Sequence, residues 1–346
     1  MNEELLMRRC LELASRGFGA TGTNPMVGAL LVHNNEIIGE GFHEQFGGPH
    51  AEVNCFNNVP DSLKHLIPES TMYVTLEPCS HYGKTPPCAL RILKERVKKV
   101  VICNNDPNPL VNGKGTALLR EQGIDVKTEV LANEGRILNK RFFCLIEQQR
   151  PYVILKWAQS ADGFFAPTDK SRMQLSNQLS QHLLHKWRSE ESAFMVGTTT
   201  ALNDSPRLNN RLWSGNSPKR VVIDRDLKIP SSHHLYDGSA PTIIFTEKIR
   251  HPQHIENVTF INLPFDERLP ENILDHLKHI GIASVVIEGG AYTINKFIEA
   301  NLWDQARIFQ TGTFMHKGVC APLLKNYIPD TRTSLGSDTL FVYLKH

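Results

Sequence analysis

The sequence predicts an α/β protein built from two different domains, with helices on both faces of a sheet. The chain has 346 residues, which is more than one hydrophobic core normally serves. Short apolar runs typical of strands alternate with amphipathic helical stretches along the chain. A polar stretch, 147–150, precedes Pro151 and separates two halves that do not resemble each other. We therefore expect domains at residues 1–147 and 148–346.

The first half is expected to begin with an amphipathic helix. Its apolar face would hold Leu5, Leu6, Cys10, Leu13 and Ala14. Apolar runs predict strands at 27–32, 72–76 and 100–103. Helices are expected to begin near Ala51 and near Pro87, and a third covers 115–122 and ends at Gly123, a suitable carboxy-terminal cap.

In the second half, the alternation of strands and helices begins again with a strand at 153–157. A long amphipathic helix follows, with Ser176 as its cap and an inward face formed by Leu179, Leu183, Leu184 and Trp187. Further strands are expected at 193–196, 221–224, 243–246 and 285–288. Four of the seven cysteines are expected to be buried small apolar residues, namely Cys10, Cys103, Cys144 and Cys320.

Composition excludes several classes of protein. Hydrophobic residues make up 40% of the chain and charged residues 21%, which is typical of a globular protein. The net charge of +2 does not indicate a nucleic-acid-binding surface. The sequence has neither an apolar run of membrane-spanning length nor an apolar signal core, and its odd number of scattered cysteines suits reduced thiols. We expect a cytoplasmic protein without nucleic-acid or membrane partners.

Three short segments of the first half predict a zinc site. They are Pro49-His50-Ala51-Glu52, Glu77-Pro78-Cys79 and Thr85-Pro86-Pro87-Cys88. One histidine and two cysteines form a soft tripod for one zinc ion per chain, with the fourth position open to water. Zinc lowers the pKa of such a water towards neutrality, and Glu52 is placed to take its proton and pass it to a leaving amine. This arrangement is typical of zinc deaminases.

Two other interpretations of this site stay open. The zinc is purely structural if His81, His43 or Cys55 supplies a fourth ligand, or the site binds no metal. Glu52 favours catalysis, because a structural site needs no acid-base residue. The common deaminase signature closes with Cys-x-x-Cys, whereas Cys88 follows Cys79 by nine positions. The longer loop carries His81 and Lys84, which indicates recognition of oxygen or phosphate groups.

Taken together, these motifs resemble the family of bifunctional riboflavin biosynthesis proteins, the RibD family. The resemblance rests on 23–29, 50–52, 77–88, 106–109 and 113–115 in the first half. In the second half it rests on 150–153, 156, 160, 162–163, 187–188, 196–198, 204–208 and 288–290. It implies a cytidine-deaminase-like α/β/α domain followed by a dihydrofolate-reductase-like α/β domain, in a homo-oligomer that is expected to be a dimer.

The resemblance also implies two reactions. The first is hydrolytic deamination of 2,5-diamino-6-(5-phosphoribosylamino)pyrimidin-4(3H)-one by a zinc-activated hydroxide. The second is NADPH-dependent reduction of the ribosyl chain, which gives 5-amino-6-(5-phosphoribitylamino)uracil. The alternatives are a deaminase of free nucleosides or tRNA with an unrelated second domain, and a non-catalytic zinc-stabilised binding protein.

Site residues follow by the same resemblance. The deaminase pocket would be lined by Asn24, His43, His81, Lys84, Asp106 and Asn108. The reductase substrate would contact Arg172, Arg188, Leu208, Arg211 and Glu288, with Arg188 and Arg211 on its phosphate. A solvated charge is the alternative for each of these two arginines. NADPH would contact Ala158, Gln174, Thr200, Asp204, Gly289 and Gly290. Lys156 and Glu288 are expected beside the carbon that receives the hydride, and a buried structural ion pair between adjacent strands is the alternative.

Two local patterns of the second half concern cofactor and metal binding. No Gly-x-Gly-x-x-Gly follows a strand, so a Rossmann site is not expected. Instead, Gly289-Gly290 ends an apolar run before a helix, which is either a phosphate-binding turn or a plain turn. His182 and His185 are spaced like a metal pair, but no third ligand stands nearby and we expect no metal there.

Overall fold

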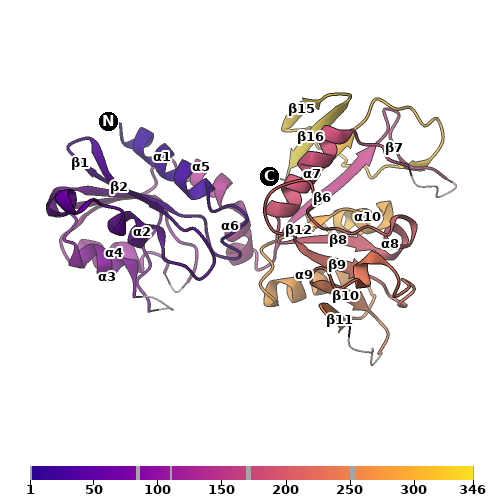
Figure 1. Cartoon of the computed structure of the whole chain (residues 1–346), viewed down its shortest axis with the longest axis horizontal. Helices are drawn as coiled ribbons and strands as arrows, with labels where there is room; N and C mark the ends of the chain where they lie inside the picture. Colours follow the sequence, from indigo (N-terminus) through magenta and orange to yellow (C-terminus); the bar gives the residue numbers. More distant parts are fainter. Residues whose placement is uncertain (1, 83–85, 110, 169–172, 250–254, 346) are drawn as a thin grey trace. The chain divides into compact units, whose positions relative to one another are not determined.

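The computed structural model describes residues 2–82, 86–109, 111–168, 173–249 and 255–345. The chain divides into two compact units, Met1–Gln149 and Arg150–His346, each with its own main sheet (Figure 1). Within the described ranges, no helix combines the length and the apolar character that a bilayer span requires.

The first unit contains a mixed five-stranded sheet in the order β2-β1-β3-β4-β5. β1 pairs antiparallel with β2 and β3, whereas β3, β4 and β5 run parallel. The strands are β1 (Gly28–His33), β2 (Glu36–Phe42), β3 (Thr71–Leu76), β4 (Lys99–Asn104) and β5 (Asp125–Lys127). The helices are α1 (Glu3–Ser15), α2 (Ala51–Asn57), the 3₁₀ helix η1 (Asp61–Glu69), α3 (Cys88–Lys94), α4 (Lys114–Glu121), α5 (Ala132–Leu138) and α6 (Lys140–Glu147).

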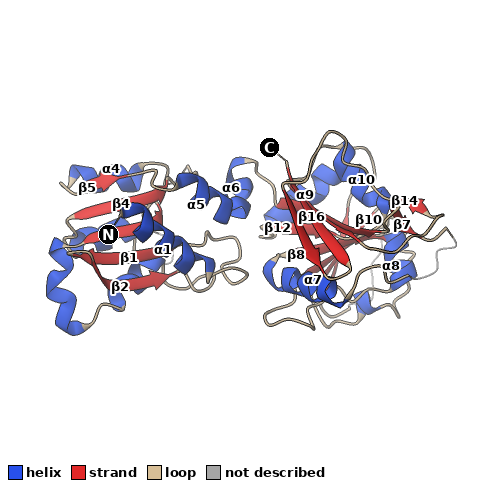
Figure 2. Cartoon of the chain, turned by 90° about the horizontal axis from the view of Figure 1, so that it is seen from above, coloured by secondary structure: helices blue, strands red, loops and turns tan. Residues whose placement is uncertain are grey.

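Helices cover both faces of this sheet because successive side chains of a strand point to opposite sides. Leu30 packs with Leu13 of α1 on one face, whereas Leu31 packs with Phe56 of α2 on the other. Figure 1 shows α1 on one side of the sheet and α2, α3 and α4 on the other, and Figure 2 shows the strand order. The predicted layer arrangement is therefore confirmed for this unit.

One glycine fixes how closely α2 approaches the sheet. Gly41 lies on β2, and a Cβ atom there would meet the backbone nitrogen of Cys55 at 2.2 Å and the carbonyl oxygen of Ala51 at 2.6 Å. Real Cβ atoms do not come so close to backbone, so only glycine lets the helix rest on the strand. This contact places the first turn of α2, which carries the candidate catalytic residues, against the sheet.

The second unit is built on a nine-stranded sheet in the order β11-β10-β9-β8-β12-β6-β13-β16-β15. The strands from β11 to β13 run parallel, and β16 and β15 pair antiparallel at one edge. The strands are β6 (Tyr152–Gln159), β8 (Ala193–Gly197), β9 (Lys219–Ile223), β10 (Thr242–Thr246), β11 (Val258–Asn262), β12 (Ser284–Ile287), β13 (Gln305–Gln310), β15 (Thr331–Leu335) and β16 (Asp338–Leu344). Two short strands, β7 (Phe164–Ala166) and β14 (Val319–Cys320), pair separately.

Helices again pack on this sheet. They are α7 (Gln178–Glu190), α8 (Thr198–Asp204), the 3₁₀ helix η2 (His234–Tyr236), α9 (Leu269–His279) and α10 (Ala291–Glu299). The main core joins Val153 and Val285 of the parallel strands to Leu277 of α9 and Phe297 of α10. Trp187 of α7 stacks on Phe309 of β13, with ring centroids 5.4 Å apart.

Several predicted details are wrong. The cap of α7 is Asn177, whose side chain accepts the N–H of Ser180, while the Ser176 hydroxyl accepts a hydrogen bond from Gln181. Leu179 is 55% exposed, because a residue five positions before Leu184 lies roughly 140° away around a helix.

Two further apolar residues were misplaced. Leu5 is 54% exposed, although the rest of the predicted face of α1 is buried. Cys320 is exposed because it lies on β14, outside the large sheet.

Candidate functional site

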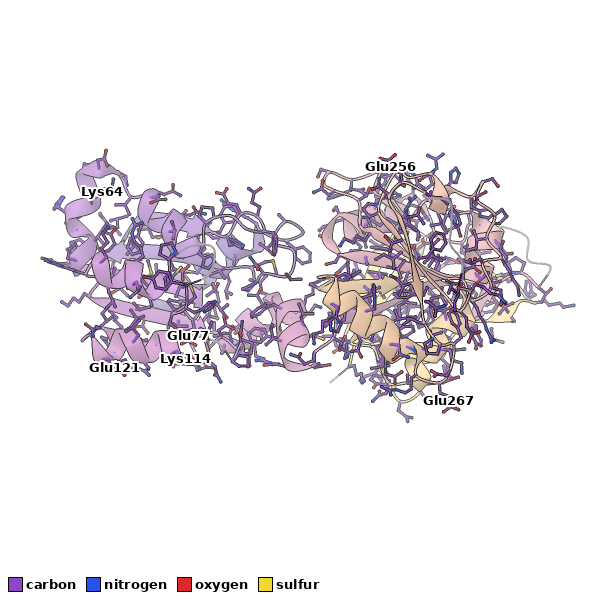
Figure 3. The ribbon with its side chains drawn as sticks, turned by 90° about the horizontal axis from the view of Figure 1, so that it is seen from below. Lys64, Glu77, Lys114, Glu121, Glu256 and Glu267 are labelled. Atoms are coloured by element: carbon purple, nitrogen blue, oxygen red, sulfur yellow. The ribbon has the colours of Figure 1, made fainter. Side chains whose placement is uncertain are left out.

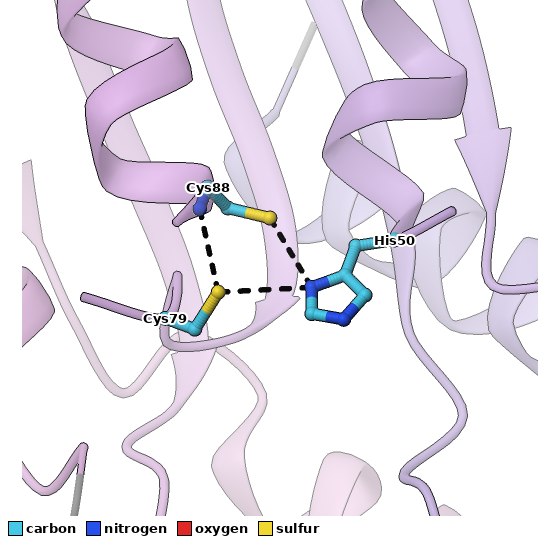
Figure 4. Close-up of side chains that lie close together, drawn as sticks. All are labelled: His50, Cys79 and Cys88. Carbon is cyan, nitrogen blue, oxygen red and sulfur yellow. Dashed lines mark hydrogen bonds between the residues drawn. The ribbon is translucent and has the colours of Figure 1, made fainter. Parts of the chain in front are cut away.

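The structure brings His50, Cys79 and Cys88 together in the first unit (Figure 4). His50 precedes α2, Cys79 lies in the loop after β3, and Cys88 is the first residue of α3. His50 Nδ1 lies 3.3 Å from Cys88 Sγ and 3.7 Å from Cys79 Sγ. A tetrahedral zinc ion holds nitrogen and sulfur ligands about 3.6 Å apart. The donor types and their spacing therefore fit zinc.

The group leaves one coordination position open. Among the side chains that the structure describes, the cluster has only these three members. His43 is engaged at both ring nitrogens: Nδ1 is 2.9 Å from the carbonyl oxygen of Pro49, and Nε2 is 3.1 Å from Nδ2 of Asn24. His81 and Cys55, the other proposed fourth ligands, also lie outside the cluster. Three protein ligands with an open position are typical of catalytic zinc sites.

One of the two thiols is held in the form that binds metal. Hydrogen bonds from Cys88 and His50 lower the pKa of Cys79 to about 4, although burial acts in the opposite direction. The backbone N–H of Cys88, at the start of α3, donates to Cys79 Sγ at 3.3 Å. Thiolates are the metal-binding form of cysteine, and a helix amino terminus favours them.

Glu52 lies in the first turn of α2, two residues from the ligand His50. It is only 3% exposed, and burial raises the pKa of its carboxyl group to about 6, with the nearby His50 opposing this shift. A carboxylate with a pKa near the working pH can both accept and return a proton, which is what a proton shuttle requires. The position of Glu52 near the ligand His50 and the raised pKa of its carboxyl group both suit this role.

The hydrogen bonds of His43 define the orientation of Asn24. The amide nitrogen of Asn24 can only donate, so Nε2 of His43 must accept, and the ring proton sits on Nδ1, which donates to Pro49. Burial lowers the pKa of His43, which keeps the ring neutral. The amide oxygen of Asn24 therefore points away from His43, where it can accept a hydrogen bond from another group. The rings of His43 and His50 meet edge to face at 5.8 Å, so this pair adjoins the zinc ligands.

The loop after β4 supplies Asp106 and Asn108. Asp106 is 9% exposed and accepts the backbone N–H of Asn108 at 2.8 Å. Burial, with a contribution from the charge of Cys79, raises the pKa of Asp106 to about 6. His81 is exposed, and the predicted residue Lys84 lies outside the described residues.

Glu77, which the sequence places in the zinc motif without a role of its own, joins this loop to the zinc ligands. Its carboxylate is 3% exposed and accepts backbone N–H groups from Asp106 at 3.3 Å, Gly113 at 2.9 Å and Thr116 at 2.9 Å. Figure 3 labels Glu77 close to Lys114, the first residue of α4. Glu77 stands two positions before Cys79, so one side chain ties the Asp106 loop to the metal-binding segment. The sequence signal for this role is the position of Glu77 in the Glu77-Pro78-Cys79 segment.

The second unit contains a cavity of about 780 Å³ at the carboxyl ends of parallel strands β6, β8 and β12. Such an edge is the usual ligand site of open parallel sheets. Most of the predicted reductase residues line it: Lys156, Ala158, Gln174, Arg188, Thr200, Asp204, Leu208, Arg211, Glu288 and Gly290. Arg172 lies outside the described residues, and Gly289 is not among the lining residues.

Three charged side chains meet in this cavity. The Glu288 carboxylate lies 3.2 Å from Lys156 Nζ and 3.0 Å from Arg188 Nη2, and all three side chains are nearly buried. Burial alone would raise the pKa of Glu288, but the charges of Arg188 and Lys156 overcome it and lower that pKa to about 2. Among the residues that the structure describes, none is a hydrogen-bond partner of the buried Nε of Arg188. Arg188 holds Glu288 through Nη2.

The glycine pair after β12 has a specific geometry. A Cβ atom on Gly289 would lie 2.6 Å from Thr200 Cγ2, and Gly290 has a φ of 72°, a left-handed conformation that favours glycine. Gly290 precedes the first residue of α10. The pair lets the start of α10 sit close to α8 at the cavity.

A second cavity, of about 860 Å³, shares Thr199, Thr200, Gly290 and Tyr292 with the first. It offers the cationic side chains of Arg225 and Lys296, which form ion pairs with Glu247 at 2.7 Å and Glu299 at 2.9 Å. Sequence reasoning missed Arg225. The signal was its position just beyond the parallel strand β9, at the edge where ligands bind.

Comparisons with known families divide the chain in the same way. The model for the cytidine and deoxycytidylate deaminase zinc-binding region matches residues 1–104, and the model for the RibD C-terminal domain matches residues 151–316. Both cysteines and the histidine of the cluster lie in the first of these ranges.

Full-length relatives are similar to the chain throughout. The riboflavin biosynthesis protein RibD of Aquifex aeolicus is 37% identical over 90% of this chain and 88% of its own length. The RibD protein of Bacillus amyloliquefaciens is 39% identical over 93% of this chain and 87% of its own length. The solved diaminohydroxyphosphoribosylaminopyrimidine deaminase/5-amino-6-(5-phosphoribosylamino)uracil reductase of Thermotoga maritima is 33% identical, with a TM-score of 0.90 over 99% of this chain and 98% of that chain.

Proposed function

The chain belongs to the RibD family of riboflavin biosynthesis proteins, and on that premise we propose that it catalyses two successive reactions on one substrate. Residues 1–147 would deaminate the phosphoribosylated diaminopyrimidinone, and residues 148–346 would reduce the ribosyl chain of the product. The observation that carries the proposal is the open His50, Cys79 and Cys88 tripod beside the buried Glu52.

In the first reaction, the residues around the tripod divide the work. His50, Cys79 and Cys88 would hold a zinc ion, which when bound would supply a water molecule acidified to near neutral pKa. Glu52 takes a proton from the attacking water and delivers it to the amine that leaves, and its pKa of about 6 suits both transfers. Burial of Glu52 excludes bulk water from competing for this proton.

Recognition of the pyrimidine would fall to the side chains next to the tripod. The amide oxygen of Asn24, oriented by His43, is available to accept a hydrogen bond from a ring N–H group. Asp106, Asn108, His81 and Lys84 would contact the remaining polar groups of the substrate. Glu77 supports this role by fixing the Asp106 loop through three backbone hydrogen bonds.

The second reaction would take place in the cavity at the ends of β6, β8 and β12. A reduced nicotinamide bound there would supply the hydride for the first carbon of the sugar. The ring oxygen would become a hydroxyl group as the sugar opens and would need a proton. Lys156 lines the cavity and is placed to donate it, because the arginines beside it do not release protons. Glu288 holds Lys156 at 3.2 Å, and Arg188 and Arg211 would bind the phosphate of the substrate.

The two adjoining cavities support NADPH as the cofactor. Together they offer room for a substrate and a dinucleotide, since single ligand sites measure about 300–1,000 Å³. Ala158, Gln174, Thr200, Asp204 and the Gly289-Gly290 turn would hold the nicotinamide half. Arg225 in the second cavity is a suitable partner for the additional phosphate that distinguishes NADPH from NADH. A homodimeric assembly and a cytoplasmic location stay predictions.

One experiment tests both reactions. The zinc-loaded full-length chain is given the diaminopyrimidinone ribotide, first without and then with NADPH, and ammonia and NADPH are followed. We expect ammonia release without NADPH, and NADPH oxidation only after deaminated ribotide has formed. Release of ammonia from cytidine, adenosine or tRNA but not from the ribotide would support the alternative deaminase and overturn the proposal. Absence of ammonia from every compound would indicate a non-catalytic zinc protein.

A further inference from the structure

A buried histidine lies between the two arginines that face the reductase cavity. His185 of α7 is 0% exposed, and its Nδ1 accepts the backbone N–H of Arg211 at 3.0 Å. Its Nε2 lies 3.4 Å from Nη1 of Arg188. Burial and the charges of Arg188 and Arg211 lower the pKa of His185 to about 4, so the ring is neutral at neutral pH. The histidine thus contacts both arginines from a position that solvent does not reach.

The hydrogen bond to Arg211 fixes the tautomer of this ring. A backbone N–H group can only donate, so Nδ1 carries the lone pair and the ring proton sits on Nε2. Nε2 and the guanidinium of Arg188 are then both donors, and their contact is not a hydrogen bond. Nη1 of Arg188 instead donates to the carbonyl oxygen of Asn209 at 3.2 Å. His185 therefore accepts a hydrogen bond through Nδ1, and the side chain of Asn210, in the same segment as Arg211, is a further hydrogen-bond partner of the ring.

These contacts anchor the segment 208–211 to α7. Leu208 is 1% exposed and has a φ of 51°, an unfavourable left-handed conformation for a leucine that the surrounding contacts must hold. The side-chain oxygen of Asn209 accepts a hydrogen bond from Nη1 of Arg211 at 3.0 Å. The two arginines come from different elements and repel each other, so their approach depends on these neutral contacts. The hydrogen bond of His185 fixes the backbone of Arg211 itself.

We propose that His185 is a positioning residue of the reductase, which holds the segment 208–211 so that Arg188 and Arg211 face one phosphate group. This inference rests on the proposed function, in which both arginines bind the phosphate of the deaminated ribotide. His185 does not line the cavity and would not touch the substrate. Its effect should therefore appear in phosphate binding and not in the hydride-transfer step.

Asparagine and glutamine substitutions at His185 distinguish the roles of its two ring nitrogens. The oxygen of an asparagine lies as many bonds from Cβ as Nδ1 does, whereas the oxygen of a glutamine reaches the position of Nε2. We expect His185→Gln to raise the KM for the deaminated ribotide about tenfold or more, because the Arg211 N–H loses its acceptor. His185→Asn should stay within about threefold of the native KM. Both variants should keep the native kcat and the native KM for NADPH, and His185→Gln should weaken competitive inhibition by inorganic phosphate.

The matched control is His182→Gln on the same helix, which should leave every constant unchanged. A native KM in His185→Gln, or an equal rise in both variants, overturns the proposal. If His185→Gln no longer binds NADPH, ¹⁵N-histidine NMR of the native chain decides: a proton on Nδ1 of His185 overturns the proposal, and an unprotonated Nδ1 supports it. Failure of the proposed function is distinguishable from failure of this inference. If the proposed function is wrong, Arg211→Ala leaves the KM for the ribotide unchanged, as His185→Gln does.

Discussion

Removal of Arg188 should destabilise the second unit, because this residue keeps a buried carboxylate ionised. Arg188→Met retains the apolar stem of the side chain and deletes its charge, which leaves Glu288 with Lys156 at 3.2 Å. The arginine and lysine charges overcome burial and lower the pKa of Glu288 from 4.5 to about 2. At about 1.4 kcal/mol per pKa unit, this net shift corresponds to roughly 3 kcal/mol for the two cations together, and removing one partner of a buried ion pair costs about 3–5 kcal/mol.

The pH dependence of this effect has a definite sign. A carboxyl group with a lowered pKa stabilises the folded state above its unfolded pKa, so the contribution of Glu288 is complete above 4.5 and is lost as the pH falls towards about 2. We expect Arg188→Met to lose about 3 kcal/mol of unfolding free energy at pH 7, measured by guanidinium unfolding and tryptophan fluorescence. The difference from the native chain should shrink below pH 4.5.

The triple variant Lys156→Met/Arg188→Met/Glu288→Gln provides the control. It removes all three charges of the cluster, so that no buried charge is left without its partners, and it should recover much of the lost stability. A single variant as stable as the native chain would refute the reasoning. So would a triple variant that is no more stable than the single one.

Three further predictions concern the metal, the proton donor and the cofactor. Cys88→Ser should reduce the zinc content well below one ion per chain, measured by elemental analysis, because a hydroxyl group is a poor zinc ligand; undiminished zinc would remove Cys88 from the tripod. Lys156→Met should lower kcat for reduction by about 10²-fold or more without changing ammonia release; an unchanged kcat would leave Lys156 only the role of a structural ion pair. Arg225→Ala should raise the KM for NADPH about tenfold and leave that for NADH unchanged in steady-state kinetics; an equal rise for both cofactors would place the extra phosphate elsewhere.

The metal cluster could be predicted from sequence because its information is local. His50 and Glu52 occupy one helix start, and proline precedes both Cys79 and Cys88. Zinc accepts few side-chain types, so the set of residues is nearly sufficient to identify the site. The same reasoning gave no role to Glu77. Its partners are backbone N–H groups more than 25 positions away, and a pattern of side chains does not reveal such contacts.

The reductase site depends on contacts over longer distances in the chain. Arg188 and Glu288 are separated by 100 positions, and the pattern around Arg188 fits a solvated charge equally well. Arg225 follows a strand without any motif. The cap of α7 was missed by one position, because Ser176 and Asn177 are both good caps and only the backbone geometry chooses between them.

The central claim is that one chain carries two separate chemistries, and Glu52→Gln tests it most directly. The variant should keep one zinc ion per chain and lose deamination by about 10³-fold, because it can no longer move the proton. Reduction of the deaminated ribotide by the same protein sample should proceed at the native rate. Deamination at the native rate, or loss of both activities together, would contradict the account.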